Sequence, residues 1–232
     1  MGVKKQILLT ATNLSKEYAT GSNETLHVLR GVQLEVVKGE IVVIVGPSGS
    51  GKSTLLHLLS GLDRPSGGTI TFGGQDLFGL DERSLTNFRN ARMGFIFQFH
   101  HLLQEFSALE NVAMPALIRG ERLKDVKDRV SVLLQDVGLA GRLHHRPAEL
   151  SGGEQQRVAV ARALMNKPEV VFADEHSGNL DEEQSIQLHE LLVRLSREHE
   201  TTFVIATHNQ DLTKRGERIL RLSEGKLVVV KR

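Results

Sequence analysis

The sequence predicts an α/β fold with a mixed-sheet core, an antiparallel β subdomain and an inserted helical subdomain. One reason is the apolar, β-branched run Ile41–Val45, which leads through a glycine-rich loop into a helical segment at 53–60. A second apolar run, at 169–173, ends in two carboxylates. Between these runs, residues 99–165 contain few strand patterns and several stretches with helical spacing.

The remaining elements follow from the same two patterns. The predicted strands are short apolar runs bounded by glycine or polar residues, and they lie at 7–14, 26–37, 41–45, 69–72, 93–97, 169–173, 202–207, 218–222 and 226–230. The predicted helices carry apolar side chains three or four positions apart, and they lie at 53–60, within 76–92, and at 122–137, 154–164 and 182–197. The early strands suit an antiparallel β portion, with Tyr18 in a loop beside it.

Residues 46–54 read Gly-Pro-Ser-Gly-Ser-Gly-Lys-Ser-Thr, which is the pattern of a phosphate-binding loop. The glycines let backbone N–H groups converge on phosphate oxygens, the lysine adds a positive charge, and the following helix points its N-terminus at the anion. The strand before the loop and the helix after it are the setting that this pattern requires. The predicted triphosphate-binding residues are Gly46, Pro47, Ser48, Gly49, Ser50, Gly51, Lys52, Ser53 and Thr54.

Asp174 and Glu175 end the apolar run at 169–173. A carboxylate at the carboxyl end of a parallel strand lies where open α/β sheets bind their ligands. Asp174 suits a Mg²⁺ ion on the β- and γ-phosphates, and Glu175 is placed to act as general base on the attacking water. Seen alone, the pair could equally be an acidic helix cap; the phosphate loop upstream favours the catalytic interpretation.

Composition limits the classes of partner. The formal net charge is +1 and aromatic residues make up 4%, which does not favour a nucleic-acid-binding surface. The absence of cysteine excludes disulfides and thiolate metal sites. The sequence shows no signal peptide and no apolar stretch of the roughly 20 residues that span a bilayer. A membrane role is therefore expected to work through another polypeptide.

With four further motifs, the chain resembles the ATP-binding cassette (ABC) ATPases over nearly its whole length. Residues 150–155, Leu-Ser-Gly-Gly-Glu-Gln, match the signature motif of that family. Gln98 matches its glutamine loop, the stretch 178–181 matches the loop after the catalytic glutamate, and His208 matches its switch histidine. Tyr18 stands where the family keeps an aromatic ring for stacking on adenine.

The resemblance implies roles for these residues. Glu175, His208 and Gln98 would be catalytic, and Ser53, Gln98 and Asp174 would hold Mg²⁺. ATP would be the substrate. Asp181 would communicate between two nucleotide sites.

The signature turn implies a second copy of the chain. Ser151 offers a hydroxyl, and Gly152 and Gly153 permit a close backbone approach to an anion. The family places this turn across a head-to-tail dimer, against the γ-phosphate held by Lys52 of the other copy. Hydrolysis would remove that bridge and let the copies separate.

The string that begins at Phe97, together with Asp174, Glu175 and the Gly-Asn-Leu-Asp at 178–181, is similar to the corresponding stretches in ATPase subunits of the lipoprotein-releasing complex and of macrolide exporters. The resemblance implies one ABC ATPase domain, with a core at 1–98 and 166–232 and a helical subdomain at 99–165. It implies a motor on the cytoplasmic face of the inner membrane, bound peripherally to transmembrane permease subunits, with no nucleic acid. The alternative is a regulatory ATPase of a cell-division or macrolide-efflux complex.

The segment 99–115 has two possible roles. The family forms here a groove for a short helix of the permease, with Phe99, Leu102, Leu103 and Phe106 as apolar wall and Glu105 and Glu110 at the rim. The same apolar side chains could instead fill the core of the helical subdomain. The sequence leaves both readings open.

Some residues depart from the family pattern or invite another function. His176 and Ser177 stand where proline and threonine are usual, and Gln104 replaces a proline of the lipoprotein-releasing branch. The adjacent histidines at 100–101 and 144–145 suggest a metal, but neighbouring side chains diverge on strands and helices. We therefore expect packing or surface roles for both pairs.

Overall fold

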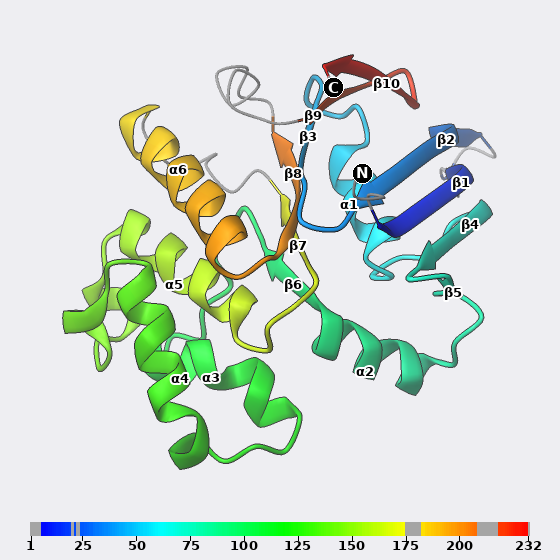
Figure 1. The fold of residues 1–232 in the computed structure, drawn as a ribbon. Helices are drawn as coiled ribbons and strands as arrows, with labels where there is room; N and C mark the ends of the chain where they lie inside the picture. The colour runs from blue at the N-terminus through cyan, green and yellow to red at the C-terminus, as the bar shows by residue number, and fades with distance from the viewer. Residues whose placement is uncertain (1–5, 20, 22–23, 175–181, 208–217, 232) are drawn as a thin grey trace, which may run out of the picture. The chain divides into compact units, whose positions relative to one another are not determined.

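The chain folds into two units, each with its own internal packing. The structure is a computed structural model that describes residues 6–19, 21, 24–174, 182–207 and 218–231 (Figure 1). The terminal unit comprises Met1–Arg89 and Thr202–Arg232, and the middle unit comprises Asn90–Thr201.

The terminal unit contains an antiparallel sheet with the strand order β2-β1-β4-β5. Its strands are β1 (Ile7–Ala19), β2 (Thr25–Val37), β4 (Gly67–Phe72) and β5 (Gln75–Asp76). In the long central strand, Leu9, Ala11 and Leu14 are buried, so one face of the sheet forms part of a core. Ala11 pairs with Leu34 on one side and with Ile70 on the other, which fixes the register.

The terminal unit also contains the strands β10-β9-β3-β8 of a mixed sheet. The strands are β3 (Ile41–Val45), β8 (Thr202–Thr207), β9 (Arg218–Ser223) and β10 (Lys226–Lys231). Parallel strands on both sides of β3 leave all five of its residues buried, as its continuous apolar sequence requires. The helix α1 (Lys52–Leu59) follows β3, and α2 (Glu82–Arg92) leads into the middle unit.

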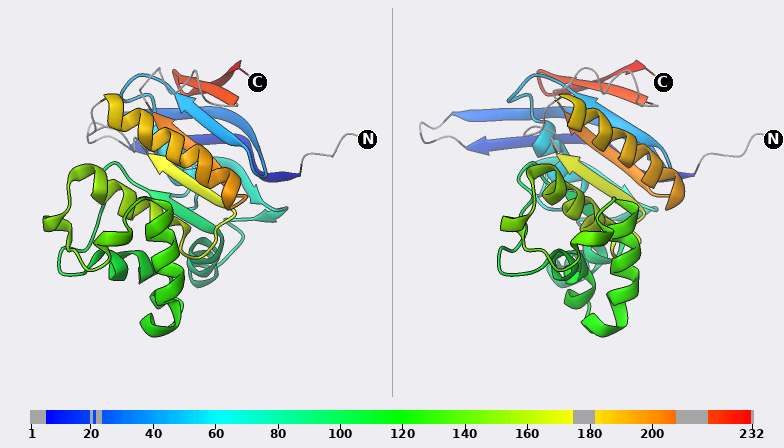
Figure 2. Two further views of the ribbon diagram at one scale, coloured as in Figure 1. Left: turned by 60° about the vertical axis from the view of Figure 1, so that its left-hand side comes forward. Right: turned by 90° about the vertical axis from the view of Figure 1, so that its left-hand side faces the viewer.

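The middle unit combines a parallel strand pair with helices. The pair is β6 (Met93–Ile96) and β7 (Val170–Asp174). The helices are α3 (Ala108–Ile118), α4 (Leu123–Asp136), α5 (Gly152–Leu164) and α6 (Glu182–Glu198), with short 3-10 turns at Ala140–Arg142 and Pro147–Glu149. Helices α3, α4 and α5 pack against one another (Figure 2). A Cβ atom on Gly94 would lie 2.3 Å from the Ala163 carbonyl oxygen, so only glycine lets β6 approach α5 so closely.

The predicted fold class is confirmed: the described residues form a mixed sheet, an antiparallel sheet and a group of helices. The predicted apolar stripe of α4 is also confirmed, since Val126, Val130 and Leu134 are buried. The placement of Tyr18 in a loop was wrong. Strand β1 runs on to Ala19, and Tyr18 pairs with Leu26 of β2. The domain boundaries at 98/99 and 165/166 stay a prediction.

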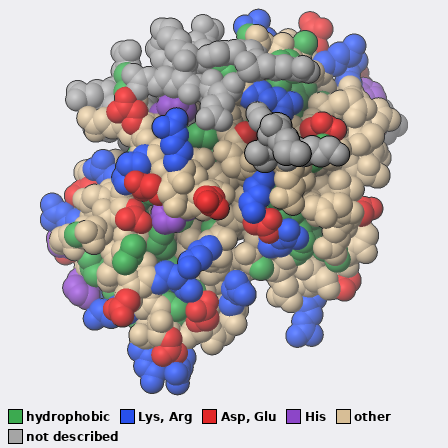
Figure 3. Space-filling model, viewed as in Figure 1, with side chains coloured by type: hydrophobic (Ala, Val, Ile, Leu, Met, Phe, Trp, Pro, Cys, Tyr) green, Lys and Arg blue, Asp and Glu red, His purple; other side chains and the backbone are tan. Residues whose placement is uncertain are grey.

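The surface of the middle unit is mixed in charge. On the face shown in Figure 3, acidic and basic side chains are interspersed. Within the described ranges, no helix combines the length and the apolar character needed to cross a membrane.

Candidate functional site

The phosphate-binding loop lies between β3 and α1 in the terminal unit. The structure has the strand, loop and helix that the sequence predicts. Gly51 precedes α1 with a φ of 97°, a left-handed conformation that favours glycine. Because α1 begins at Lys52, its first turn supplies backbone N–H groups without intrahelical partners and the positive end of the helix dipole. This geometry suits an anion.

Lys52 is buried under the loop. The residue is only 4% exposed, and its Nζ donates hydrogen bonds of 3.0 Å to the carbonyl oxygens of Gly46 and Pro47. These bonds hold the ammonium group at the base of the loop. A lysine ammonium group in this position is the positive charge that a loop of this pattern brings to a phosphate.

The loop also passes close to β9. A Cβ atom on Gly46 would lie 2.4 Å from the Leu222 carbonyl oxygen and 2.7 Å from Ser50 Oγ, so glycine is required. The Ser50 hydroxyl is buried and has no hydrogen-bond partner among the described residues. An orphaned hydroxyl inside this loop fits a phosphate oxygen as its missing partner.

A cavity of about 600 Å³ lies beside the loop. Its walls include loop residues 47–50, His27 and Arg30 of β2, and Glu224 and Lys226 at the turn between β9 and β10. The cavity has the size of a small-molecule site, and most of its charged wall is basic.

Tyr18 lies near the end of β1, in the same unit as the loop. Its residue is 40% exposed, and its hydroxyl donates a hydrogen bond of 3.0 Å to Asp63 Oδ2. Asp63 comes shortly after the last residue of α1. The structure thus connects the predicted adenine-stacking ring to the far end of the helix that follows the phosphate loop.

Gln98 and Asp174 stand at the ends of two neighbouring strands in the middle unit. Strands β6 and β7 run parallel, and Ile96 is the register partner of Ala173. Asp174 therefore ends β7 beside the segment that carries Gln98, at the carboxyl edge where sheets of this kind bind ligands. Lys52 and Ser53 belong to the terminal unit. A single site formed by Lys52 and Ser53 together with Gln98 and Asp174 therefore stays a prediction.

The signature turn is a rigid helix start. Ser151 is the N-cap of α5: its hydroxyl accepts from the Glu154 N–H at 3.3 Å, and Glu154 Oε2 accepts from the Ser151 N–H at 2.8 Å. These bonds, with an ion pair of 3.1 Å to Arg142, hold the pKa of Glu154 below its usual value, and the bond from the Ser151 backbone contributes most. Gly152 is exposed, and a Cβ atom there would meet no atom of the described residues within 4 Å. The turn is thus preformed and open on its outer side.

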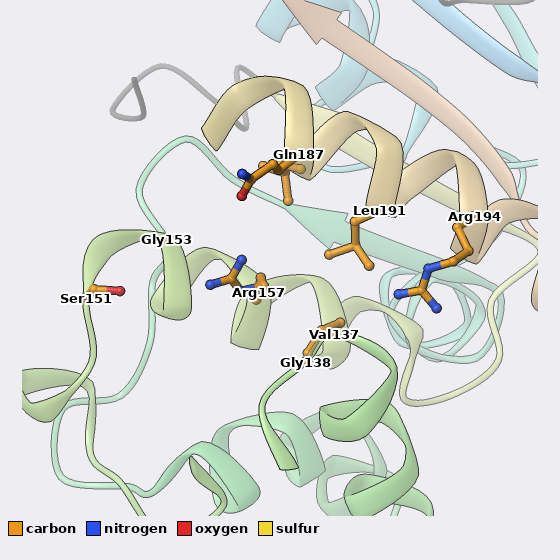
Figure 4. Close-up of a pocket in the computed structure, with 9 residues that line it drawn as sticks. Val137, Gly138, Ser151, Gly153, Arg157, Gln187, Leu191 and Arg194 are labelled. Atoms are coloured by element: carbon orange, nitrogen blue, oxygen red, sulfur yellow. The ribbon is translucent and has the colours of Figure 1, made fainter. Parts of the chain in front are cut away.

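A cavity of about 330 Å³ separates α5 from α6 within the middle unit (Figure 4). Ser151, Gly153 and Arg157 line it from the start of α5, and Gln187 and Arg194 line it from α6. Figure 4 shows the Arg157 side chain pointing toward the α6 side of the cavity. The first turns of the signature helix are therefore not packed tightly against α6.

Several predicted positions lie outside the described residues: Glu175, His176, Ser177, the stretch 178–181 that contains Asp181, and His208. Their roles stay predictions. The adjacent histidine pairs do lie in the described ranges. There, no group of three or more His, Cys, Asp or Glu side chains is arranged to hold a metal ion.

The apolar segment after Gln98 exposes most of its large side chains. Phe99 is 64% exposed, Leu103 45% and Phe106 38%, whereas Leu102 is 7% exposed and belongs to the core. We call Phe99, Leu103 and Phe106 the apolar patch. The sequence left open whether these four side chains form a surface or fill the core. In the structure one of them, Leu102, fills the core and the other three are exposed.

The apolar patch rests on a side chain that the sequence analysis missed. Asn111 is fully buried, and its Oδ1 accepts from the Leu103 N–H at 2.8 Å. Its Nδ2 donates to the carbonyl oxygens of Leu103, Phe106 and Ser107 at 3.0–3.1 Å. One amide thus fixes the backbone from 103 to 107. The sequence did contain a signal for this role, because Asn111 is a polar residue among apolar positions of α3.

Beside the apolar patch, a cavity of about 650 Å³ has charged walls. Glu105 and Glu110, the predicted rim residues, both line it, together with Lys124, Lys127 and Arg146. Hydrogen bonds from Ser107 are the main reason why the pKa of Glu110 lies below its usual value. The Glu110 carboxylate therefore stays charged, and it lines the cavity together with basic side chains from α4 and from the loop before α5.

Arg162 was also missed. It lies on α5, and its guanidinium donates hydrogen bonds of 2.7 Å to the carbonyl oxygens of His100 and His101. Burial lowers the pKa of Arg162, although an arginine remains charged at neutral pH. The signature helix is thereby bound directly to the segment after Gln98.

The chain matches known proteins over nearly its full length. The family model described as "ABC transporter" matches residues 29–178. The lipoprotein-releasing system ATP-binding protein LolD 1 of Chlorobium luteolum is 51% identical over 226 residues, which cover 95% of this chain and 96% of that protein. The LolD of Legionella pneumophila (strain Lens) is 50% identical, covering 95% and 97%. The LolD of Pseudomonas fluorescens is 48% identical, covering 98% and 100%.

Solved structures agree with this relationship. A dimeric structure of MJ0796, a bacterial ABC transporter cassette, has a TM-score of 0.87 and 36% identity, with 97% of this chain and all of the other covered. A second dimeric structure of MJ0796, in a post-hydrolysis state bound to ADP and Pi, has a TM-score of 0.87 and 35% identity. The phosphate loop, the signature turn and these matches together show that the chain belongs to the ABC transporter family. Within that family it is a nucleotide-binding ATPase.

Proposed function

We propose that this chain is the ATP-hydrolysing subunit of a complex that releases lipoproteins from the inner membrane. The observation that carries the proposal is the preformed phosphate loop with its buried Lys52, in a chain about 50% identical to LolD proteins along nearly its whole length. The alternative, a regulatory ATPase of cell division or macrolide efflux, is not favoured by these relatives.

In the proposed site, the nucleotide is held by the phosphate loop, Gly46 to Thr54, and by Tyr18. Lys52 and the first N–H groups of α1 bind the β- and γ-phosphates, and Tyr18 stacks on adenine. The loop fits a triphosphate because it combines a buried ammonium, an orphaned hydroxyl and a helix N-terminus.

Magnesium fits the donor set of Ser53, Gln98 and Asp174. These residues supply a hydroxyl, an amide oxygen and a carboxylate, which are the hard oxygen ligands that Mg²⁺ prefers. When bound, the ion would neutralise charge on the phosphate oxygens.

Three side chains carry the proposed hydrolysis. Glu175 takes a proton from the attacking water, and Gln98 and His208 orient that water and the γ-phosphate. Asp181 transmits the state of one site to the other. This assignment follows the order of the motifs along the chain.

We propose a head-to-tail dimer as the working state of the nucleotide sites. Ser151, Gly152 and Gly153 of one copy would contact the γ-phosphate held by Lys52 of the other. The rigid cap of α5 and the open space around Gly152 support this, because a second anion could approach the turn without rearrangement.

The proposed membrane partner is a permease subunit that docks a short helix on the apolar patch at the cytoplasmic face of the inner membrane. The exposure of these three large apolar side chains supports the proposal, because an apolar surface of this kind can receive the apolar side of a partner helix. The core at 1–98 and 166–232 would then turn over ATP, and the helical subdomain at 99–165 would transmit the movement.

The function is tested by expressing the chain with its native membrane neighbours and reconstituting the complex with a labelled lipoprotein. We expect ATP-dependent release that is lost in Glu175→Gln. A complex that hydrolyses ATP without releasing lipoprotein would contradict the proposed cargo.

The docking surface has a matched control. Phe99→Glu should prevent co-purification with the permease and leave the ATPase of the free chain intact. Ile118→Glu changes a side chain that is 68% exposed outside the apolar patch, and it should assemble normally. Equal assembly of both variants would place the permease elsewhere.

A further inference from the structure

Tyr18 is held by a charged pair that lies outside the nucleotide-binding motifs. Lys16 Nζ lies 2.8 Å from both carboxylate oxygens of Asp63. The same ammonium group donates a hydrogen bond of 2.7 Å to the Arg64 carbonyl oxygen. The Tyr18 hydroxyl donates to Asp63 Oδ2 at 3.0 Å. One carboxylate therefore accepts from both the lysine and the tyrosine.

Lys16 also covers one face of the Tyr18 ring. Its Nζ lies 4.8 Å from the ring centroid, in a cation–π contact. Lys16 is only 9% exposed, whereas Tyr18 is 40% exposed. A flat ligand that stacks on Tyr18 must therefore use the face opposite the ammonium group.

Asp63 is a fixed extension of α1. The backbone N–H groups of Leu62 and Asp63 donate to the His57 carbonyl oxygen, at 2.8 and 3.2 Å. Helix α1 begins at Lys52 of the phosphate loop. Through Asp63, the Tyr18 ring is thus held in a fixed orientation relative to α1, the helix whose N-terminus lies at the phosphate loop.

Two further bonds hold the neighbouring backbone without Asp63. The Ser66 N–H donates to the Ser15 carbonyl oxygen at 2.9 Å, and the Glu17 N–H donates to Ser66 Oγ at 3.0 Å. Because these bonds connect the same two segments, loss of the Asp63 carboxylate should free the ring without separating the segments.

The Asp63 carboxylate is ionised at neutral pH. Its partial burial acts to raise its pKa, but hydrogen bonds from Lys16 and Tyr18 outweigh burial and hold the pKa below the usual value. The contact with Lys16 is therefore a charge-assisted one.

We propose that Asp63 and Lys16 are positioning residues of the nucleotide site. They fix the ring of Tyr18 so that one face is closed and the other receives adenine while the triphosphate lies on the phosphate loop. The inference rests on the proposed role of Tyr18. It implies that the pair contributes to binding of adenine nucleotides and makes no contribution to binding of a bare polyphosphate.

The test is isothermal titration of the full chain with ATP and, separately, with inorganic tripolyphosphate. Asp63→Ala should raise the Kd for ATP about fivefold, as expected when one orienting hydrogen bond is lost. The Kd for tripolyphosphate should stay within about twofold of wild type. Tyr18→Phe keeps the ring but removes its hydroxyl, and it should show a smaller loss in the same direction.

Glu82→Ala is the matched control. It breaks an exposed ion pair of 2.7 Å with Arg64, the residue next to Asp63, and it does not touch Tyr18. Its affinity for both ligands should equal that of wild type.

A coupled measurement separates positioning from a general structural effect. In a Tyr18→Ala background, Asp63→Ala should cause no further loss of ATP affinity, since the ring it positions is gone. The inference is overturned if Asp63→Ala binds ATP like wild type, if the losses simply add, or if tripolyphosphate binding falls equally. If Tyr18→Ala itself binds ATP normally while Lys52→Ala does not, the stacking role and this inference are wrong but the ATPase function stands. Failure of the wild type to bind ATP would refute the proposed function itself.

Discussion

At the scale of single residues, Lys52 has the most defined role. Its ammonium group is buried and held by two loop carbonyl oxygens. A phosphate that enters the loop adds a negative partner to a charge that is already in place, so little reorganisation is needed on binding.

Lys52→Ala should therefore weaken ATP binding by at least about tenfold, because a charge-assisted contact contributes roughly 1.5–3 kcal/mol. Lys38→Ala removes an exposed lysine of the same unit and serves as control. The Kd for ATP, measured by titration calorimetry, checks the prediction. Equal affinity of the two variants would remove Lys52 from the site.

His100 gives a prediction for pH. Burial lowers the pKa of His100, and this outweighs an interaction with Gln156 that acts to raise it. A lowered pKa means that the unfolded chain binds a proton more readily than the folded chain. Stability should therefore be complete at neutral pH and fall as pH drops below the usual histidine value of about 6.5.

The measurement is the urea midpoint at about pH 7.5 and about pH 5.5, compared between wild type and His100→Gln. The substitution should reduce the decrease in stability between the two values. An unchanged decrease would mean that His100 does not titrate across this interval.

The sequence predicted those residues that belong to a short local motif with a known chemical role. Lys52, Ser151 and Gly152 stand in short patterns in which spacing and chemistry coincide. Asp63 and Arg162 carry no such pattern. Their partners lie 45 positions away, at Tyr18, and 61 positions away, at His101, so only the folded chain reveals the contacts.

At the scale of elements, α3 and α5 begin with the same device. Ser107 and Ser151 are N-caps, and Glu110 and Glu154 complete the two capping boxes. Sequence analysis predicted α5 but not α3. Pro115 lies inside α3, and because proline disfavours a helix interior, the sequence pattern did not indicate a helix there. The helix nevertheless runs from Ala108 to Ile118.

The two caps allow a paired test. Ser107→Ala and Ser151→Ala should each lower the free energy of unfolding by about 1 kcal/mol, because each removes one N-cap hydroxyl. Only Ser151→Ala should also lower ATP turnover, since only this hydroxyl belongs to the proposed phosphate-facing turn. Chemical denaturation and steady-state ATPase assays check the two effects. Equal turnover in both variants would assign Ser151 a purely structural role.

Strand β1 shows what local patterns underestimate. The prediction ended it near residue 14, where the sequence becomes polar, but β1 continues to Ala19. Pairing with β2 and irregularities in register carry the strand past this point. Tyr18 therefore sits on a strand, in a position fixed by sheet pairing.

At the level of the complete chain, one copy carries two glycine turns at helix starts, and we propose that both contact phosphate. The phosphate loop belongs to the terminal unit and the signature turn to the middle unit. The proposed account is that a γ-phosphate joins the first turn of one copy to the second turn of another, and that hydrolysis ends the contact. This part of the account depends on a second copy, which no single-chain pattern can specify in full.

The most direct measurement is the molar mass of Glu175→Gln with and without ATP, by size-exclusion chromatography with light scattering. We expect twice the monomer mass of 25.7 kDa when ATP is present, and the monomer mass without it. Adding Gly152→Asp, at a position with open space for a side chain, should prevent the dimer by placing a carboxylate against the phosphate. If the Glu175→Gln protein binds ATP and stays monomeric, or if the dimer forms equally well with Gly152→Asp, the γ-phosphate does not join two copies through the signature turn.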